Sequence, residues 1–125
     1  MKYKYPFDRK FRIKIHDDWW QMYIVTEEEA VELDVICNDS TDGFRALTYT
    51  SEKCMFVVET YISKDIIAHE LFHVYVKYFH MTSAEITVSQ FEEVVADFLE
   101  ENLDKFVKMR NKLYNRFRKL EERYR

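Results

Sequence analysis

The sequence predicts an α+β fold: a small, twisted, mainly antiparallel sheet packed on a buried central helix and on a long C-terminal helix. Strand-like alternation occupies the first half of the chain, whereas the second half carries apolar residues at helical spacing. One glycine and one proline in 125 residues leave few chain breaks, which favours long regular elements. At this length we expect a single domain over residues 1–125.

The N-terminal third is expected to begin with a strand and to end with a short helix. Residues 7–15 alternate between apolar and polar side chains, as a half-buried strand does. Residues 21–25 suit either a second short strand or a turn of helix, and the pattern does not decide between them. Thr26-x-x-Glu29 is a capping-box pattern, and we expect the helix that it starts to end near Leu33.

A hairpin and two helices account for the rest of the chain. Residues 44–50 and 54–60 are strand-like and are separated by a short polar turn. Ser63 is a good N-cap for a helix that extends to about residue 79, whose apolar residues cover almost every side, so we expect this helix to be buried. A last helix is expected over residues 90–125, with a basic extension from residue 105 onwards.

The central helix contains the most informative motif of the chain, His69-Glu70-Leu71-Phe72-His73. Positions i and i+4 of a helix share one side, so the two imidazoles can bind one Zn²⁺. Glu70, beside the first histidine, is then expected to be the general base that takes a proton from the attacking water. The alternative is a helix whose histidines only pack and whose glutamate is solvated.

A catalytic zinc site needs a third protein ligand, and three residues after the motif compete for that role. His80 is one position out of register with the H-E-x-x-H-x-x-G-x-x-H pattern. Glu93 pairs with Asp97 at i+4, so one carboxylate can bind the metal while the other orients a histidine. Glu92 is the alternative metal ligand, although Ser89-x-x-Glu92 is also a capping box.

With these residues the chain resembles the gluzincins, the H-E-x-x-H…E branch of the zincin metallopeptidases, over about residues 62–98. The resemblance implies that His69, His73 and Glu93 bind zinc. By the same resemblance, Asp97 orients one of these ligands, for which His69 is the first candidate. It also implies that the hairpin before the motif helix offers an edge strand to which a peptide substrate adds as another strand. Small zincins of this kind occur in phages and bacteria, and some cleave repressors. The pattern of that group is matched only in part here, so repressor cleavage is not implied.

Composition and charge limit the compartment and the partners. No apolar run approaches the ~20 residues of a membrane span and no export signal follows Met1, so we expect a cytoplasmic protein without membrane contact. Cys37 and Cys54 form no metal-binding spacing, which favours buried thiols over zinc ligands. Residues 1–14 carry six basic and one acidic side chain, and residues 105–125 carry nine and two, whereas the intervening segment is strongly acidic.

The sequence therefore predicts a zinc-dependent peptidase that acts on a protein or peptide. The alternative is a non-catalytic, zincin-shaped binding protein that uses the basic C-terminal helix to contact a protein or a nucleic acid. Of these partners, nucleic acid is the less favoured by the sequence. The oligomeric state is left open.

Overall fold

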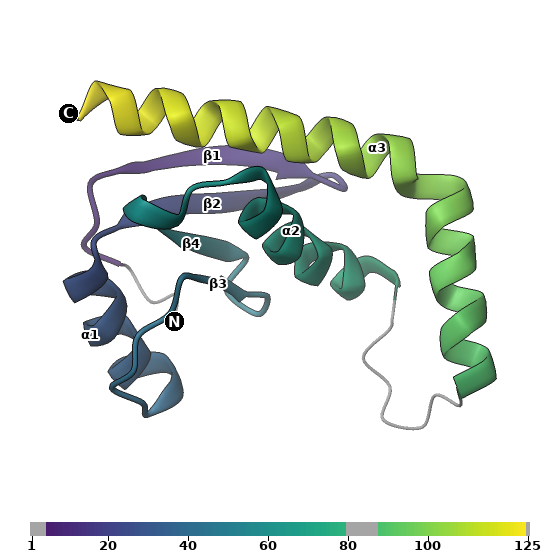
Figure 1. The fold of residues 1–125 in the computed structure, drawn as a ribbon, viewed down its shortest axis with the longest axis horizontal. Helices are drawn as coiled ribbons and strands as arrows, with labels where there is room; N and C mark the ends of the chain where they lie inside the picture. Colours follow the sequence, from purple (N-terminus) through teal and green to yellow (C-terminus); the bar gives the residue numbers. More distant parts are fainter. Residues whose placement is uncertain (1–4, 80–87, 125) are drawn as a thin grey trace.

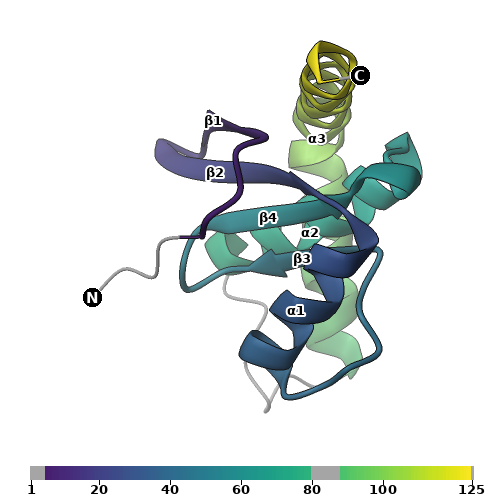
Figure 2. The ribbon, with the colours of Figure 1, turned by 90° about the vertical axis from the view of Figure 1, so that its left-hand side faces the viewer.

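The computed structural model describes residues 5–79 and 88–124, and it shows a four-stranded mixed sheet with helices on both faces (Figures 1 and 2). The strands are β1 (Lys10–Ile15), β2 (Asp18–Val25), β3 (Ala46–Tyr49) and β4 (Cys54–Val58), in the order β1-β2-β4-β3. The α+β class is confirmed. The pairs β1/β2 and β3/β4 are antiparallel, but the central pair β2/β4 is parallel.

The parallel pair exists because a helix crosses over between β2 and the β3–β4 hairpin, as parallel strands require. This helix, α1, covers Glu27–Asn38 and is longer than expected. The predicted capping box is present: Thr26 Oγ1 accepts from the Glu29 backbone at 3.1 Å, and Glu29 accepts from the Thr26 backbone at 2.9 Å. Its other end is closed by Asp39 in the left-handed conformation.

The strand predicted at residues 7–15 is confirmed from Lys10 onwards, and the undecided segment is a strand that starts earlier than residue 21. Ile15 pairs with Asp18, so His16 and Asp17 form a two-residue turn between β1 and β2. Both have positive φ, 50° and 64°, as a type I′ hairpin turn requires.

Helices α2 (Lys64–Phe79) and α3 (Val88–Arg123) complete the fold, and a 3₁₀ turn at Glu59–Tyr61 joins β4 to α2. Ser63 caps α2 as predicted, since its Oγ accepts from the backbone N–H of Ile66 at 3.2 Å. The helix α3 begins two residues before the predicted start at residue 90.

The sheet separates two apolar cores. One lies between the sheet and α2 with α3, and contains Ile13, Trp20, Met55, Leu71 and Phe117. The other lies between the opposite face and α1 with the N-terminal segment, and contains Phe7, Tyr23, Leu33 and Phe56. Figure 1 shows that the second half of α3 runs along β1, while its first half turns away beside the end of α2. In the described part of the chain, no helix is both long and apolar enough to cross a membrane.

Candidate metal centre

The motif helix α2 presents one face to the core and the other to solvent. Ile67, Leu71 and Val74 are fully buried against the sheet, whereas His69 and His73 lie on the exposed side. The prediction of a helix buried on all sides is therefore wrong for this face. The physical reason is that α3 touches α2 only along part of its length, which leaves the histidine side open.

Three side chains of α2 form a compact group of potential metal ligands. Nitrogen and oxygen atoms of His69, Glu70 and His73 all lie within 4.8 Å of one another. The two imidazole rings have centroids 5.1 Å apart, and His69 Nε2 lies 3.8 Å from Glu70 Oε2. The predicted motif residues are thus together on one turn of helix. In the described ranges, no residue of α3 belongs to this group.

Glu70 differs from the two histidines because it is buried. Its side chain is 8% exposed, compared with 67% for His69. The carboxylate accepts a hydrogen bond from Thr48 Oγ1 at 2.8 Å, and the same hydroxyl lies 3.2 Å from the Glu70 carbonyl oxygen. Thr48 belongs to β3, one of the two edge strands of the described sheet. A buried charge needs such a partner, and this one fixes the glutamate between the edge strand and the histidines.

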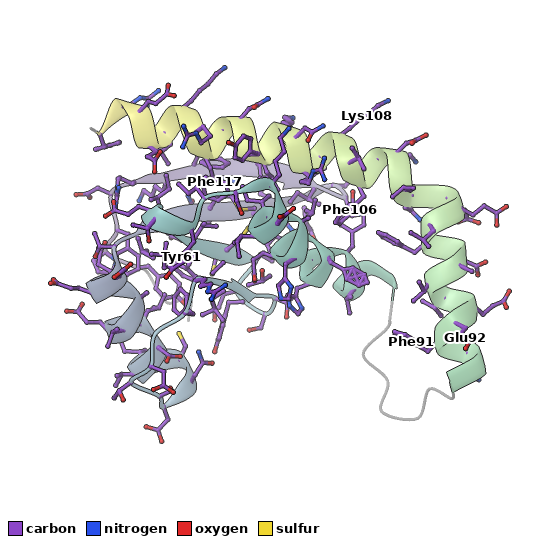
Figure 3. The ribbon with its side chains drawn as sticks, in the orientation of Figure 1. Tyr61, Phe91, Glu92, Phe106, Lys108 and Phe117 are labelled. Atoms are coloured by element: carbon purple, nitrogen blue, oxygen red, sulfur yellow. The ribbon has the colours of Figure 1, made fainter. Side chains whose placement is uncertain are left out.

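A groove of about 540 Å³ opens beside the histidines, between α2 and the first half of α3. Its floor is formed where α3 packs on α2, with the ring of Phe98 5.5 Å from Phe72 and 5.6 Å from Tyr75. Figure 3 shows Phe106 pointing from α3 toward α2. The groove is mainly apolar, and its polar lining is confined to the α2 side. The lining residues are Asp65, Ala68, His69, Phe72, His73, Val95, Phe98, Leu99, Leu103 and Phe106.

The carboxylates predicted from α3 are all exposed, and they point in different directions. Val95 and Leu99 line the groove, and Glu92 precedes them by three and seven residues, so it shares their side of the helix. At about 100° per residue, Glu93 and Asp97 lie on the side of α3 opposite to the groove. In this conformation Glu92 is better oriented toward the histidines than Glu93. The ligand role of Glu93 and the orienting role of Asp97 stay predictions.

Two further residues on which predictions rested lie outside the described part of the chain. These are His80 and the side chain of Ser89. Two others were missed and now belong to the site. Asp65 precedes His69 by four residues and lines the same groove, a spacing that the sequence does display. Thr48 lies 22 residues from Glu70, and no local pattern marks it.

The two cysteines lie far from this chemistry. Cys54 is 2% exposed in the core on the α1 side of the sheet, and Cys37 packs against the same core. Burial raises the pKa of Cys54 to about 12 and also raises that of Cys37. Because the thiolate is the metal-binding form, these surroundings disfavour both as ligands. The expectation of buried thiols fits Cys54, whereas Cys37 is only half-buried.

The donor set of α2 fits a zinc ion. Imidazole nitrogens on a tetrahedral zinc, each bound at about 2.0–2.1 Å, are separated by roughly 3.3 Å. The present separation of less than 4.8 Å needs only small rotations of two exposed rings. Two histidines do not complete a catalytic site, so a further ligand has to come from another residue.

In comparisons with family models, curated proteins and solved structures, the chain had no significant match.

Proposed function

We propose that the protein is a zinc-dependent peptidase in which His69 and His73 bind the metal and Glu70 is the general base. The observation that carries this proposal is the contrast within one helical turn: two solvent-facing imidazoles beside a buried carboxylate held by Thr48. If the histidines served only to pack the helix, they would not be expected to lie exposed to solvent. If Glu70 were only a solvated surface residue, it would not be expected to be buried.

A bound zinc ion would supply Lewis acidity and lower the pKa of water toward neutrality. The remaining tasks fall to side chains. Glu70 would accept the proton of the attacking water and pass it to the leaving amine, as a positioned carboxylate does in general acid–base catalysis. The hydrogen bond from Thr48 keeps its carboxylate in one place, which favours transfer of that proton in a fixed direction.

The edge strand β3 supports a peptide as the substrate. It pairs with β4 on one side only, and Thr48 joins it directly to Glu70. An extended peptide that added to the free side of β3 would run past the histidines, with main-chain hydrogen bonds supplying the affinity. This placement rests on the resemblance to zincins and on the position of β3 next to α2.

The third ligand is proposed to be a glutamate from the first turns of α3. Glu93 is favoured by its pairing with Asp97, whereas the direction of the side chain favours Glu92. Both remain in the proposal. Measuring the zinc content of single variants distinguishes Glu92 from Glu93 as the third ligand.

The first experiment is elemental analysis of the protein purified without chelators or a metal-binding tag, in parallel with Glu92→Gln, Glu93→Gln and the matched exposed control Glu100→Gln. We expect about one zinc per chain in the control. We expect a loss of zinc in one of the other two variants. Absence of zinc from every preparation, also after zinc is added back, would overturn the proposal.

The second experiment measures cleavage of a complex peptide mixture by mass spectrometry, with Glu70→Gln as the test variant. Zinc content should be retained in this variant, while cleavage should fall by at least ~100-fold because the general base is lost. Zinc binding without cleavage by the natural sequence would instead favour the non-catalytic binding protein.

A further inference from the structure

The outer side of α3 carries a straight row of basic side chains, which we call the lysine face. Its residues are all exposed and recur at intervals of three, four and seven, so they share the side of the helix that faces away from the sheet. Figure 3 shows Lys108 pointing outward, whereas Phe106 and Phe117 point to the body of the molecule. The lysine face consists of Lys105, Lys108, Lys112, Lys119 and Arg123.

The arginines nearest to the sheet have structural partners of their own. Arg116 donates to the Arg12 carbonyl oxygen at 3.0 Å and covers the Phe11 ring at 4.4 Å. Arg118 pairs with Glu121 at 3.2 Å. Among the described residues, the ion pairs include no member of the lysine face. The charged groups of this face therefore have no close ion-pair partner among the described residues.

The charge of the chain is segregated in space as well as in sequence. β1 lies against the second half of α3, where Phe11 meets Phe117 at 4.9 Å, so this basic strand and the basic half of α3 are neighbours. The strand adds exposed Lys10, Arg12 and Lys14, which alternate with the residues packed under α3 and therefore lie on the other face of the sheet. Both views place α1, which starts with three glutamates, at the opposite end of the molecule (Figures 1 and 2). A polyanion would be attracted to the α3 edge and repelled by the α1 end.

We propose that the lysine face binds the phosphate backbone of duplex nucleic acid without regard to sequence. This surface is separate from the histidine site, so the proposal does not depend on peptidase activity. From Lys105 to Arg123 the face covers 18 helical steps, or about 27 Å of helix at 1.5 Å per residue. That length matches about eight base pairs of a duplex at 3.4 Å each.

The composition of the face favours a backbone contact over the other anionic partners. Three large apolar residues of this half of α3, Leu113, Phe117 and Leu120, are buried in the core, and Tyr124 just after the helix is exposed. None of the three buried residues is free to enter a bilayer, as an amphipathic membrane helix requires. Protein interfaces are poor in lysine and rich in aromatic residues, and the lysine face has the reverse composition. Flexible ammonium groups on an exposed helix are suited to phosphates, which need no fixed geometry.

The test uses the full-length protein and a fluorescent 20-base-pair DNA duplex of arbitrary sequence, with binding followed by anisotropy from 50 to 200 mM salt. The test variant is Lys108→Gln/Lys112→Gln/Lys119→Gln. The control is Arg45→Gln/Lys53→Gln/Lys64→Gln, which changes net charge equally but lies off the lysine face. Circular dichroism checks that both variants are folded.

For the natural sequence, we expect a plot of the logarithm of the binding constant against the logarithm of the salt concentration to be linear. Its slope should reach about −4.5 if all five charges contact phosphates. The test variant should lose at least tenfold in affinity at 50 mM salt, and its slope should be shallower by about 2.7. The control should change affinity less than threefold. A second duplex of unrelated sequence should bind equally well.

Several results would overturn the proposal. One is no binding by the natural sequence at 50 mM salt, and another is an equal loss in both triple variants, which would reflect net charge alone. Binding to vesicles that contain anionic lipid but not to the duplex would assign the face to a membrane surface. Self-association that is lost only in the test variant, without duplex binding, would assign it to the acidic end of a second copy.

Discussion

At the residue scale, Glu70 and Thr48 form the contact on which the proposed chemistry depends. The hydroxyl of Thr48 donates a hydrogen bond to the Glu70 carboxylate, which is almost entirely buried. A hydrogen bond to a charged group is worth about 1.5–3 kcal/mol, which corresponds to roughly 10- to 100-fold in a rate. Thr48 is therefore a positioning residue: it acts on the reaction through Glu70.

Replacing Thr48 by valine tests this role, because valine keeps the shape of threonine and removes the hydroxyl. We expect Thr48→Val to lower kcat for peptide cleavage by about 10- to 100-fold, with KM and zinc content unchanged. Thr48→Ser, which restores the donor, should recover most of kcat. If the valine variant lost zinc or if serine failed to rescue it, Thr48 would have a merely structural role.

Some residues of the site could be predicted from the sequence and others could not. His69, Glu70 and His73 could be recognised because a helix fixes their spacing within five residues. Thr48 could not, since its contact with Glu70 is made by tertiary packing across 22 residues. Asp65 lies four residues before His69, but an acidic residue near a helix start is also common for electrostatic reasons alone, so its position does not single it out.

At the scale of elements, the first half of α3 packs on α2 through a cluster of aromatic rings around Phe98. Phe98 is 6% exposed and packs on Phe72, Tyr75 and Phe106 at centroid distances of 5.5–5.7 Å. Phe91, two turns earlier on the same helix, is 54% exposed. The α3 side of the groove beside the histidines is thus held in place by the packing around Phe98.

The matched pair Phe98→Ala and Phe91→Ala tests that dependence. Truncation of a buried phenylalanine typically costs about 3–5 kcal/mol, whereas exposed positions change stability by roughly 0.5 kcal/mol or less. Urea unfolding at equilibrium should show that difference in the free energy of unfolding. Equal effects of the two substitutions would mean that the first half of α3 does not pack stably on α2.

The elements themselves were predicted unevenly, for physical reasons. The capping box at Thr26 and the N-cap at Ser63 are local signals, and both are present in the structure. The start of β2 was missed because its turn is made by His16 and Asp17, which lack the usual Asn-Gly signature of a type I′ turn. The parallel pairing of β2 with β4 depends on how α1 crosses the sheet, which no local pattern encodes.

At the scale of the whole molecule, the C-terminal segment combines a buried apolar side with an exposed basic side. Its basic residues suggested an extension to the domain. The structure shows that Leu113, Phe117 and Leu120 of the same segment are buried in the main core, beside Ile13 and Ile15 of β1. The first and last elements of the chain therefore stabilise each other, and the charges lie on the other side of the helix.

This arrangement predicts that residues 105–125 are required for folding while the lysine face is not. Burial of three large apolar side chains contributes about 5–9 kcal/mol in total, which is comparable with the ~5–15 kcal/mol that separates a folded domain from its unfolded chain. A truncated protein ending at Asp104 should lack a cooperative thermal transition by circular dichroism. The variant Lys108→Gln/Lys112→Gln/Lys119→Gln should unfold within about 1 kcal/mol of the natural sequence, because exposed substitutions have small effects. A cooperative transition in the truncated protein would instead show that the segment is a separable extension, and the second half of α3 would then have binding as its main role.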